Sequence, residues 1–343
     1  MKILHGFAVA AGFAFVMVSL GAQTPANPAL YGADPNYKVP RLANGQPDLQ
    51  GVWGNNGVTP MARPRQWKDK AVITDAELQE IKQLASKSVD EGGDAIFGNF
   101  IQQLLDAKEK DGYKQNSYDP TTGNYNQFWM ADRDWDHRTS LIIDPPDGQF
   151  PPLTPEAQAR RTAAAARPRT RGPADGPEDR PLSERCISYG APRTQANYNS
   201  YTQIIQSEQN VVLLQEMIHD ARVVPLAARP HLPKKLRQLH GDPRGRWEGD
   251  TLVVETTNYI NGFQGSTPDV KLTERYTRVS PDFINWQVTV EDPATWTKPY
   301  TFMVRLKKAQ GQIYEYACHE GNYAMEGILA GARAEEKKGK KKQ

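Results

Sequence analysis

Apolar and polar residues alternate with a period of two over much of the second half of the chain, between residues 200 and 318. The alternating segments are rich in Val, Ile, Thr, Tyr, Phe and Trp, a composition typical of strands that bury one face. Strands are therefore predicted at 201–207, 211–217, 218–226, 251–259, 271–279, 283–291, 299–307 and 312–318.

Short turn sequences separate these segments, such as Gly249-Asp250 between two apolar flanks and Pro281-Asp282 further on. Consecutive strands joined by tight turns are antiparallel, and the spacing leaves no room for crossover helices. The pattern predicts a mainly β fold, an antiparallel up-and-down (lipocalin-like) β-barrel with a helical and loop-rich N-terminal elaboration. A β-sandwich is the alternative, since periodicity does not reveal closure. Far upstream, Gly51-Val52-Trp53 resembles the opening motif of lipocalin-like barrels and would have to join this sheet.

The first part of the chain predicts helices and loops. Thr74 and Glu77 form a capping box that precedes apolar residues at helical spacing, so a helix of about three turns is expected there. Further helices are expected at 96–105 and 155–166, and a structured loop at 113–155. The segment 167–181 is rich in Pro and charge and is the best linker candidate.

The N-terminus indicates export. Lys2 precedes a short apolar run that ends in small residues near Ala22, as in a secretory signal peptide, so a periplasmic or secreted protein is expected. The apolar run is short for a membrane span, and no stable span is expected after cleavage. The predicted organisation is a signal peptide at 1–22, an extended arm at 23–46, the elaboration at 47–182, the barrel at 183–333 and a basic disordered tail at 334–343.

The chain has two cysteines, Cys186 and Cys318, which flank the β-rich part. An oxidising compartment allows them to form a disulfide, and this is the expected state. Two separately buried thiols are the alternative. A zinc site is disfavoured because neither cysteine has a second ligand at the usual spacing.

Charge and motifs narrow the functional classes. The net charge is +2, and residues 335–343, with five Lys and two Glu, leave a net −1 for the rest, so a nucleic-acid binder is disfavoured. The chain has neither G-x-G-x-x-G nor a P-loop, and it lacks the G-x-S-x-G elbow and the usual metal-ligand spacings. No cofactor and no metal are expected, and the expected partner is a small-molecule ligand or substrate.

His219 is the leading candidate for acid–base chemistry. A strand at 218–226 places His219 on one face and Glu216, Asp220 and Arg222 on the other. An imidazole with a pKa near ~6.5 suits proton transfer at neutral pH, with Asp220 and Arg222 shaping the local field. A solvated outer face with an ordinary ion pair is the alternative interpretation.

Glu274, Tyr276 and Arg278 share one face of the strand at 271–279 and form a second polar patch, which faces either the barrel interior or solvent. His319 follows Cys318 directly, so a disulfide would fix its backbone, and it is a further catalytic candidate. The Pro-, Lys- and Arg-rich segment 229–240, flanked by two histidines, is expected to be a solvated loop.

Several long motifs resemble a large family of exported proteins from soil and marine bacteria. The motifs are ERCISYGAPR (184–193), QEMIHDARVVPL (215–226), GDPRGRWEGDTLVVETTNY (241–259) and YEYACHEGNYAMEGILAGAR (314–333). The resemblance extends roughly over residues 47–333. It implies export and a β-rich body, and it implies no particular reaction.

Two hypotheses follow for the function. The first is an exported, cofactor-independent enzyme of the lyase, hydratase or isomerase type, which performs general acid–base chemistry on a small aromatic, terpenoid or sugar-derived compound in a barrel pocket. The alternative is a non-enzymatic periplasmic or envelope binding protein for a small apolar ligand. Polar residues that lie close together in the pocket favour the enzyme, and an entirely apolar lining favours the binding protein.

Overall fold

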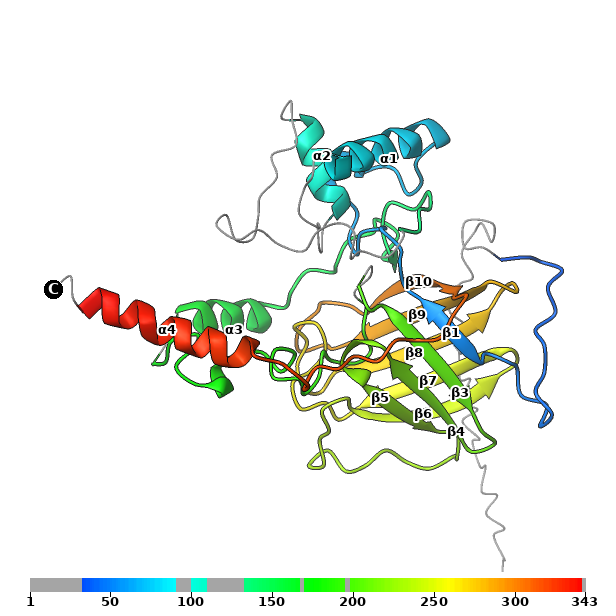
Figure 1. Ribbon diagram of the computed structural model, residues 1–343. Coiled ribbons are helices and arrows are strands. Elements are labelled where there is room, and N and C mark those ends of the chain that lie inside the picture. Colours follow the sequence, from blue (N-terminus) through cyan, green and yellow to red (C-terminus); the bar gives the residue numbers. More distant parts are fainter. Residues whose placement is uncertain (1–32, 91–99, 110–132, 167–169, 195–197, 341–343) are drawn as a thin grey trace, which may run out of the picture.

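The fold is a barrel-shaped antiparallel sheet with helices outside it, as seen in a computed structural model (Figure 1). The structure describes residues 33–90, 100–109, 133–166, 170–194 and 198–340. The strands are β1 (Gly51–Gly54), β2 (Ile142–Asp144), β3 (Tyr201–Gln206), β4 (Asn210–Gln215), β5 (Ala221–Pro225), β6 (Asp242–Glu248), β7 (Thr251–Thr257), β8 (Lys271–Arg278), β9 (Phe283–Glu291) and β10 (Tyr300–Lys308). The helices are α1 (Asp75–Asp90), α2 (Phe100–Glu109), α3 (Pro155–Ala166) and α4 (Ala324–Lys340).

In the described part of the chain, nine strands form the wall of the barrel in the order β5-β4-β3-β1-β10-β9-β8-β7-β6, and the short β2 also pairs with β10. The mainly β, nearly closed barrel that the sequence predicts is therefore confirmed. The topology is not simply up-and-down, because β1 enters from far upstream between β3 and β10.

The insertion of β1 has a geometric consequence for closure. Every neighbouring pair in the wall is antiparallel, and the number of strands is odd, so β5 and β6 run in the same direction where the two ends of the sheet meet. No ladder joins β5 to β6 in the described part of the chain. We call the place where β5 meets β6 the seam. It closes by side-chain packing: the Val224 side chain of β5 lies so close to Gly245 of β6 that a Cβ atom on Gly245 would be 2.7 Å from Cγ1 of Val224.

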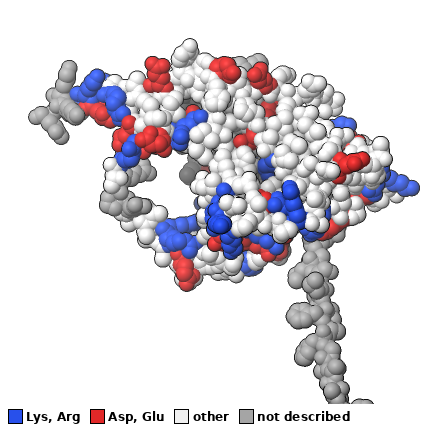
Figure 2. Space-filling model, turned by 90° about the horizontal axis from the view of Figure 1, so that it is seen from below, with Lys and Arg blue, Asp and Glu red and all other residues white. Residues whose placement is uncertain are grey.

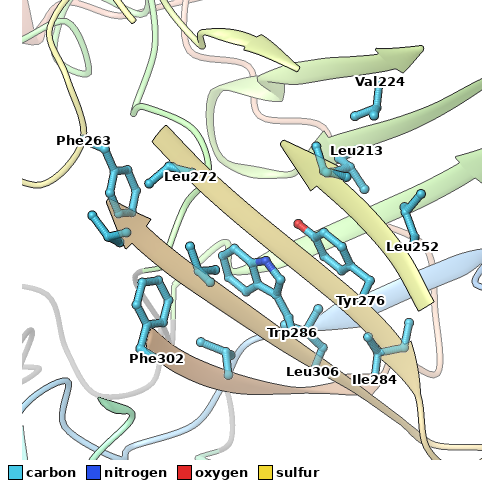
Figure 3. Close-up of a cluster of buried hydrophobic side chains, with 14 of the residues drawn as sticks. Leu213, Val224, Leu252, Phe263, Leu272, Tyr276, Ile284, Trp286, Phe302 and Leu306 are labelled. Carbon is cyan, nitrogen blue, oxygen red and sulfur yellow. The ribbon is translucent and has the colours of Figure 1, made fainter. Parts of the chain in front are cut away.

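The barrel interior is a packed apolar core. Along β8 every second residue is buried, and β4, β7, β9 and β10 also contribute to the buried cluster. Figure 3 shows the rings of Tyr276 and Trp286 side by side among aliphatic side chains from several strands. Trp53 of β1 is fully buried and donates its indole N–H to the carbonyl of Leu49 at 2.9 Å. The β1 strand thus joins the sheet and also fills the core.

Two of the predicted strands differ from the structure. The segment 218–226 is a strand only from Ala221, because Ile218 and His219 have positive φ angles of 55° and 45° in a tight turn after β4. The segment 312–318 is irregular rather than a strand. It contacts the turn after β4, where the backbone N–H of Tyr314 donates to the carboxylate of Glu216 at 3.0 Å. Two strands were missed by the sequence prediction. For β6 it identified only the turn that follows, and the three-residue β2 lies where a structured loop was expected.

Helices α1 and α2 pack on each other with a small apolar core of their own, beyond β10 in Figure 1. The predicted capping box is present: the N–H of Glu77 bonds to Oγ1 of Thr74 at 3.2 Å, and the N–H of Thr74 bonds to Oε2 of Glu77 at 2.9 Å. The α1 helix is longer than predicted, with 16 residues. The predicted start of the second helix at residues 96–99 lies outside the described residues, and α3 has the predicted bounds.

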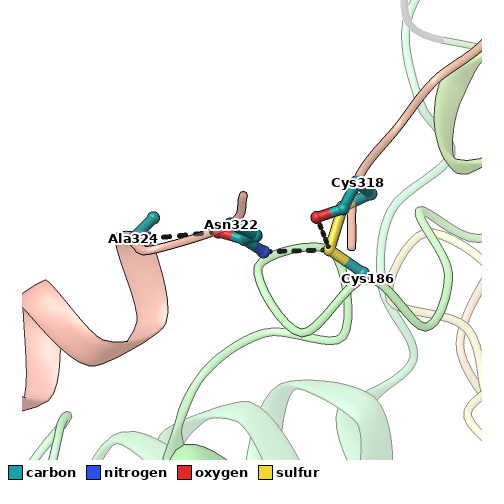
Figure 4. Close-up of a disulfide and its surroundings, with 4 residues drawn as sticks. All are labelled: Cys186, Cys318, Asn322 and Ala324. Carbon is teal, nitrogen blue, oxygen red and sulfur yellow. Dashed lines mark hydrogen bonds between the residues drawn. A yellow bond between two sulfur atoms is a disulfide. The ribbon is translucent and has the colours of Figure 1, made fainter. Parts of the chain in front are cut away.

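The predicted disulfide between Cys186 and Cys318 is present and joins the loop before β3 to the segment before α4 (Figure 4). Asn322 stands beside it, with Nδ2 3.0 Å from Sγ of Cys186, and its Oδ1 accepts the N–H of Ala324 at the start of α4. The disulfide therefore fixes both the loop and the beginning of the last helix.

The end of the chain does not form the predicted disordered tail as far as it is described, because α4 continues to Lys340. Opposite charges at helical spacing stabilise this stretch: Lys338 pairs with Glu335 at 2.6 Å, and Arg333 pairs with Glu336. The prediction of a disordered tail did not consider these pairs.

The predicted N-terminal arm is bound to the barrel over its described part. The N–H of Asp34 bonds to the carbonyl of Val279 at 3.0 Å, and Arg41 pairs with Asp250. The predicted signal peptide at 1–22 lies outside the described residues. Within the described ranges, no helix has the length and apolarity needed to cross a bilayer. Positive and negative side chains are interspersed over the face in Figure 2.

Candidate functional site

Two polar groups in the barrel region are candidates for function, and the first lies inside the barrel. Arg222 of β5 reaches across the interior to Glu274 of β8, and both side chains are almost completely buried. Nη1 of Arg222 donates to Oε2 of Glu274 at 3.1 Å, and Nη2 donates to Oε1 of Glu274 and to Oγ1 of Thr256 at 3.3 Å. The bidentate geometry holds β5 to β7 and β8 across the barrel.

Two aromatic residues complete this inner network. The hydroxyl of Tyr276 donates to Oε2 of Glu274 at 2.8 Å, and the indole N–H of Trp286 donates to the same oxygen at 3.2 Å. The two rings are stacked, with their centroids 5.8 Å apart. Burial and the negative Glu274 raise the pKa of Tyr276 well above its usual value. Burial alone would lower the pKa of Arg222, but the carboxylate of Glu274 outweighs it and raises the pKa.

The free space beside this network is too small for a substrate. A cavity of about 20 Å³ is lined by Arg222, Tyr276, Gln215 and Arg193, among others. This volume is enough for about one water molecule, whereas ligand pockets measure roughly 300–1,000 Å³. Three buried atoms of lining residues have no hydrogen-bond partner among the residues that the structure describes, namely Nε of Arg193, Oε1 of Gln215 and Nε of Arg222. The inner network therefore stabilises the barrel and borders a polar void.

The second polar group lies at the end of the barrel where β3, β5, β6 and β8 begin. A cleft of about 430 Å³ opens there between the loop before β3, the loop before β6 and the loop between β7 and β8. Its volume falls within the range of small-molecule sites. The first of these loops contains Cys186, so the disulfide holds one wall of the cleft in place. The lining residues include Leu182, Ser188, Tyr189, Pro192, Arg193, Leu239, Phe263 and Gln264.

Ser188, Asp220 and His240 form a hydrogen-bonded cluster at this cleft. Oγ of Ser188 lies 2.8 Å from Nε2 of His240 and donates to Oδ2 of Asp220 at 2.9 Å. Nε2 of His240 lies 3.3 Å from Oδ1 of Asp220. The backbone N–H of Tyr189 donates to Oδ2 of Asp220 at 3.0 Å, and that of Gly190 donates to Oγ of Ser188 at 2.8 Å. Ser188 is the member of the cluster that lines the cleft.

The three residues come from three separate segments. Asp220 ends the tight turn that precedes β5, and His240 lies two residues before β6. Ser188 belongs to the loop that begins at the disulfide. The cluster consequently spans the seam between β5 and β6 at the mouth of the barrel, where the backbone provides no ladder. The arrangement brings an imidazole, a carboxylate and a hydroxyl within hydrogen-bonding distance, which is a combination suited to proton transfer.

The structure brings some of the predicted site residues together and separates others. Glu274, Tyr276 and Arg222 meet in the inner network. The prediction that Glu274 and Tyr276 share one face of their strand is confirmed, and the alternative in which this face points to solvent is wrong. Asp220 is buried in the mouth cluster rather than beside Arg222. Glu216 is buried as well and bonds to the backbone of Tyr314, away from both groups.

His219 and His319 do not join either group. The strand that would place His219 beside its predicted partners is absent, because the turn at 217–219 directs its exposed side chain away from the barrel interior. His319 is exposed next to the disulfide. The imidazole that contacts Asp220 is that of His240, which the sequence analysis placed in a solvated loop.

Ser188, Arg193 and His240 were missed as site residues. Ser188 and Arg193 both belong to the motif ERCISYGAPR. Their closeness in sequence to Cys186 was the feature that could have identified them as site residues. For His240 the sequence offered only its position at the end of a loop. In the described residues, no group of three or more His, Cys, Asp and Glu side chains is arranged to hold a metal ion.

Comparison of the chain with models of protein families, with curated proteins and with solved structures gives no match. The resemblance to exported bacterial proteins therefore stays an expectation from the motifs. The assignment of the site depends on its geometry.

Proposed function

We propose that the protein is an exported enzyme that acts on a small molecule in the cleft at the barrel mouth, by general acid–base chemistry of the lyase, hydratase or isomerase type. The observation that carries this proposal is the cluster of Ser188, Asp220 and His240, with the Ser188 hydroxyl lining a cleft of about 430 Å³. Cofactor-independent proton transfer needs no group beyond these side chains.

The cluster suits a proton relay. The Ser188 hydroxyl donates to Asp220 in the structure. When the hydroxyl turns to a substrate atom in the cleft and gives up its proton, Nε2 of His240, 2.8 Å from Oγ, supplies the replacement. Asp220 contacts both partners and stabilises the protonated imidazole. His240 is therefore the general acid–base in this proposal, in place of His219.

A serine hydrolase mechanism fits this geometry less well. In a Ser-His-Asp triad the carboxylate binds the imidazole nitrogen opposite the one that faces the serine. Here Asp220 and Ser188 both approach Nε2 of His240, and the Ser188 hydroxyl donates to Asp220. The geometry therefore favours proton transfer over nucleophilic attack by Ser188.

The apolar walls of the cleft support the second candidate, a binding protein for a small apolar ligand. Leu182, Pro192, Leu239 and Phe263 line the cleft. Such walls suit an aromatic or terpenoid compound better than a sugar, whether the compound is a substrate or only a ligand. Chemical change of the bound molecule distinguishes the two functions.

The test uses the full mature chain in D₂O with a panel of small aromatic, terpenoid and sugar-derived compounds, followed by NMR. An acid–base enzyme converts a panel member or exchanges its carbon-bound hydrogen for deuterium, and His240→Gln and Ser188→Ala each lower that rate by about 10²-fold or more. His219→Gln is the matched control and keeps the wild-type rate. Binding of panel members without exchange or conversion in the wild type overturns the enzyme proposal in favour of the binding protein.

A further inference from the structure

Arg193 is a buried cation in the wall of the cleft. It lines both the cleft and the inner cavity of about 20 Å³. Only 9% of the residue is exposed. Its guanidinium lies 5.0 Å from the ring centroid of Tyr189, and Nη1 and Nη2 donate to the backbone carbonyls of Asn199 and Tyr198.

No carboxylate forms an ion pair with Arg193 in the described part of the chain, and its Nε has no hydrogen-bond partner there. The two carboxylates that attract Arg193 electrostatically, those of Glu216 and Asp220, are engaged elsewhere. Glu216 accepts the N–H of Tyr314, and Asp220 accepts hydrogen bonds from Ser188 and Tyr189. Burial outweighs the attraction of these groups and lowers the pKa of Arg193 to about 10. An incompletely compensated buried cation is unfavourable, and an anion bound beside it would relieve that cost.

The rest of the cleft has a different character. Arg193 is the only charged residue among the described residues that line it. The other lining side chains are apolar, as in Leu182, Leu239 and Phe263, or neutral and polar, as in Ser188 and Gln264. A ligand that matches this lining has an apolar body and a single negative group.

We propose that the cleft takes small aromatic or terpenoid carboxylates, with Arg193 as the residue that recognises the carboxylate group. This inference rests on the proposed function of the cleft and names its substrate class. A planar guanidinium suits a carboxylate because it presents several donors in one plane, and such charge-assisted hydrogen bonds are stronger than neutral ones. Each Nη nitrogen carries two hydrogens and Nη1 and Nη2 each donate to one backbone carbonyl, so each keeps a second N–H for a carboxylate, whereas Nε is shielded from solvent.

The test compares benzoate with benzamide and phenylacetate with phenylacetamide, which differ in charge but hardly in shape. Calorimetry on the full mature protein is expected to show about 10-fold or greater preference for each carboxylate over its amide. Arg193→Gln is expected to abolish the preference and leave amide binding unchanged. Arg65→Gln, which removes an exposed arginine beside α2, is the matched control and keeps the preference.

A second measurement does not depend on a variant, because Arg193→Gln also removes two hydrogen bonds to the backbone. NMR of arginine Nε–H groups in the wild type is expected to show one resonance that shifts when benzoate is added and does not shift when benzamide is added. The absence of such a shift would contradict the inference. If carboxylates and amides bind equally, if neither binds, or if Arg193→Gln keeps the preference, the inference is wrong.

The failure of this inference is distinguishable from the failure of the proposed function. Conversion of neutral compounds that depends on His240, without any preference for carboxylates, overturns the substrate class and keeps the acid–base function. Carboxylate binding that depends on Arg193, with no hydrogen exchange or conversion of any bound compound, overturns the enzyme and keeps the ligand class.

Discussion

Oδ1 of Asp220 lies 3.3 Å from Nε2 of His240, and the two residues stand at the beginnings of β5 and β6, the strands at which the sheet ends. The candidate site is thus built at the seam of the barrel. Two strands that start at the same end and are joined by packing alone can present loops and polar side chains toward one opening. The insertion of β1 makes the number of strands odd, so β5 and β6 run in the same direction and begin at the same end of the barrel. Asp220 and His240 therefore meet at that end.

The first prediction concerns the packing of this seam. Gly245→Ala is expected to lower the free energy of unfolding by about 1–3 kcal/mol, because the new Cβ would lie 2.7 Å from Cγ1 of Val224 and 2.9 Å from Cδ2 of Leu226. Urea denaturation measures the change. Gly311→Ala is the control, since nothing lies within 4 Å of its Cβ position, and a change within about 0.5 kcal/mol is expected. Equal stability of the two variants would show that the seam is loosely packed.

The sequence predicted the barrel but not its mouth, for a physical reason. Alternation is a local property, and it correctly placed Glu274 and Tyr276 on the buried face of β8. Their contact with Arg222 depends on closure of the sheet, which alternation does not contain. Likewise His240 contacts Asp220 only because β5 and β6 meet at the seam, and nothing local marks that meeting.

The error at His219 has a local cause. Assigning alternate residues of 215–226 to opposite faces of a strand assumes an extended backbone. Ile218 and His219 instead adopt positive φ angles, which non-glycine residues rarely have. Once the backbone turns there, the faces assigned on either side of the turn are no longer related. Asp220 and Arg222 accordingly reach two different polar groups instead of one.

The second prediction concerns the disulfide between Cys186 and Cys318, which are 132 residues apart. Replacement of both by Ser is expected to lower the free energy of unfolding by about 5 kcal/mol on the chain-entropy estimate. The same variant is expected to weaken ligand binding in the cleft, because the loop that carries Ser188 and Arg193 loses its anchor.

Urea denaturation with and without reductant measures this effect, and reductant is expected to destabilise the wild type but not the double variant. Thiol titration of the unfolded wild type gives a direct check. Two free thiols in the absence of reductant would contradict the disulfide.

The third prediction concerns the buried pair of Arg222 and Glu274. Arg222→Met and Glu274→Gln are each expected to cost about 3–5 kcal/mol, because each leaves a buried polar group without its partner. The double variant is expected to cost less than the sum of the two, since no charge then stays unpaired. The double-mutant cycle is measured by urea denaturation.

The exposed pair of Lys338 and Glu335 provides the control cycle, and its coupling energy is expected to stay below about 1 kcal/mol. A coupling energy for Arg222 and Glu274 no larger than that of the surface pair would mean that the inner network contributes little to holding β5 against β8.

The fourth prediction is an alkaline dependence of stability that depends on Tyr276. Burial and the Glu274 carboxylate raise the pKa of the Tyr276 phenol in the folded state, whereas in the unfolded chain its pKa is about 10. The folded protein therefore keeps this proton at pH values where the unfolded chain releases it. The resulting stability is fully present below about pH 10 and is lost as the pH rises through the folded-state pKa, by up to about 1.4 kcal/mol per pH unit.

Tyr276→Phe removes this contribution, so the stability difference between wild type and variant is expected to shrink as the pH rises from about 9 to 11. Urea denaturation across that range measures the difference, and tyrosinate absorbance of the folded protein reports ionisation directly. Tyr314→Phe is the control, because Tyr314 is 82% exposed and its removal is expected to leave the alkaline slope unchanged. A constant difference between wild type and Tyr276→Phe over the whole range would mean that Tyr276 ionises as readily in the folded barrel as in the unfolded chain, and its hydrogen bond to Glu274 would then not hold the proton.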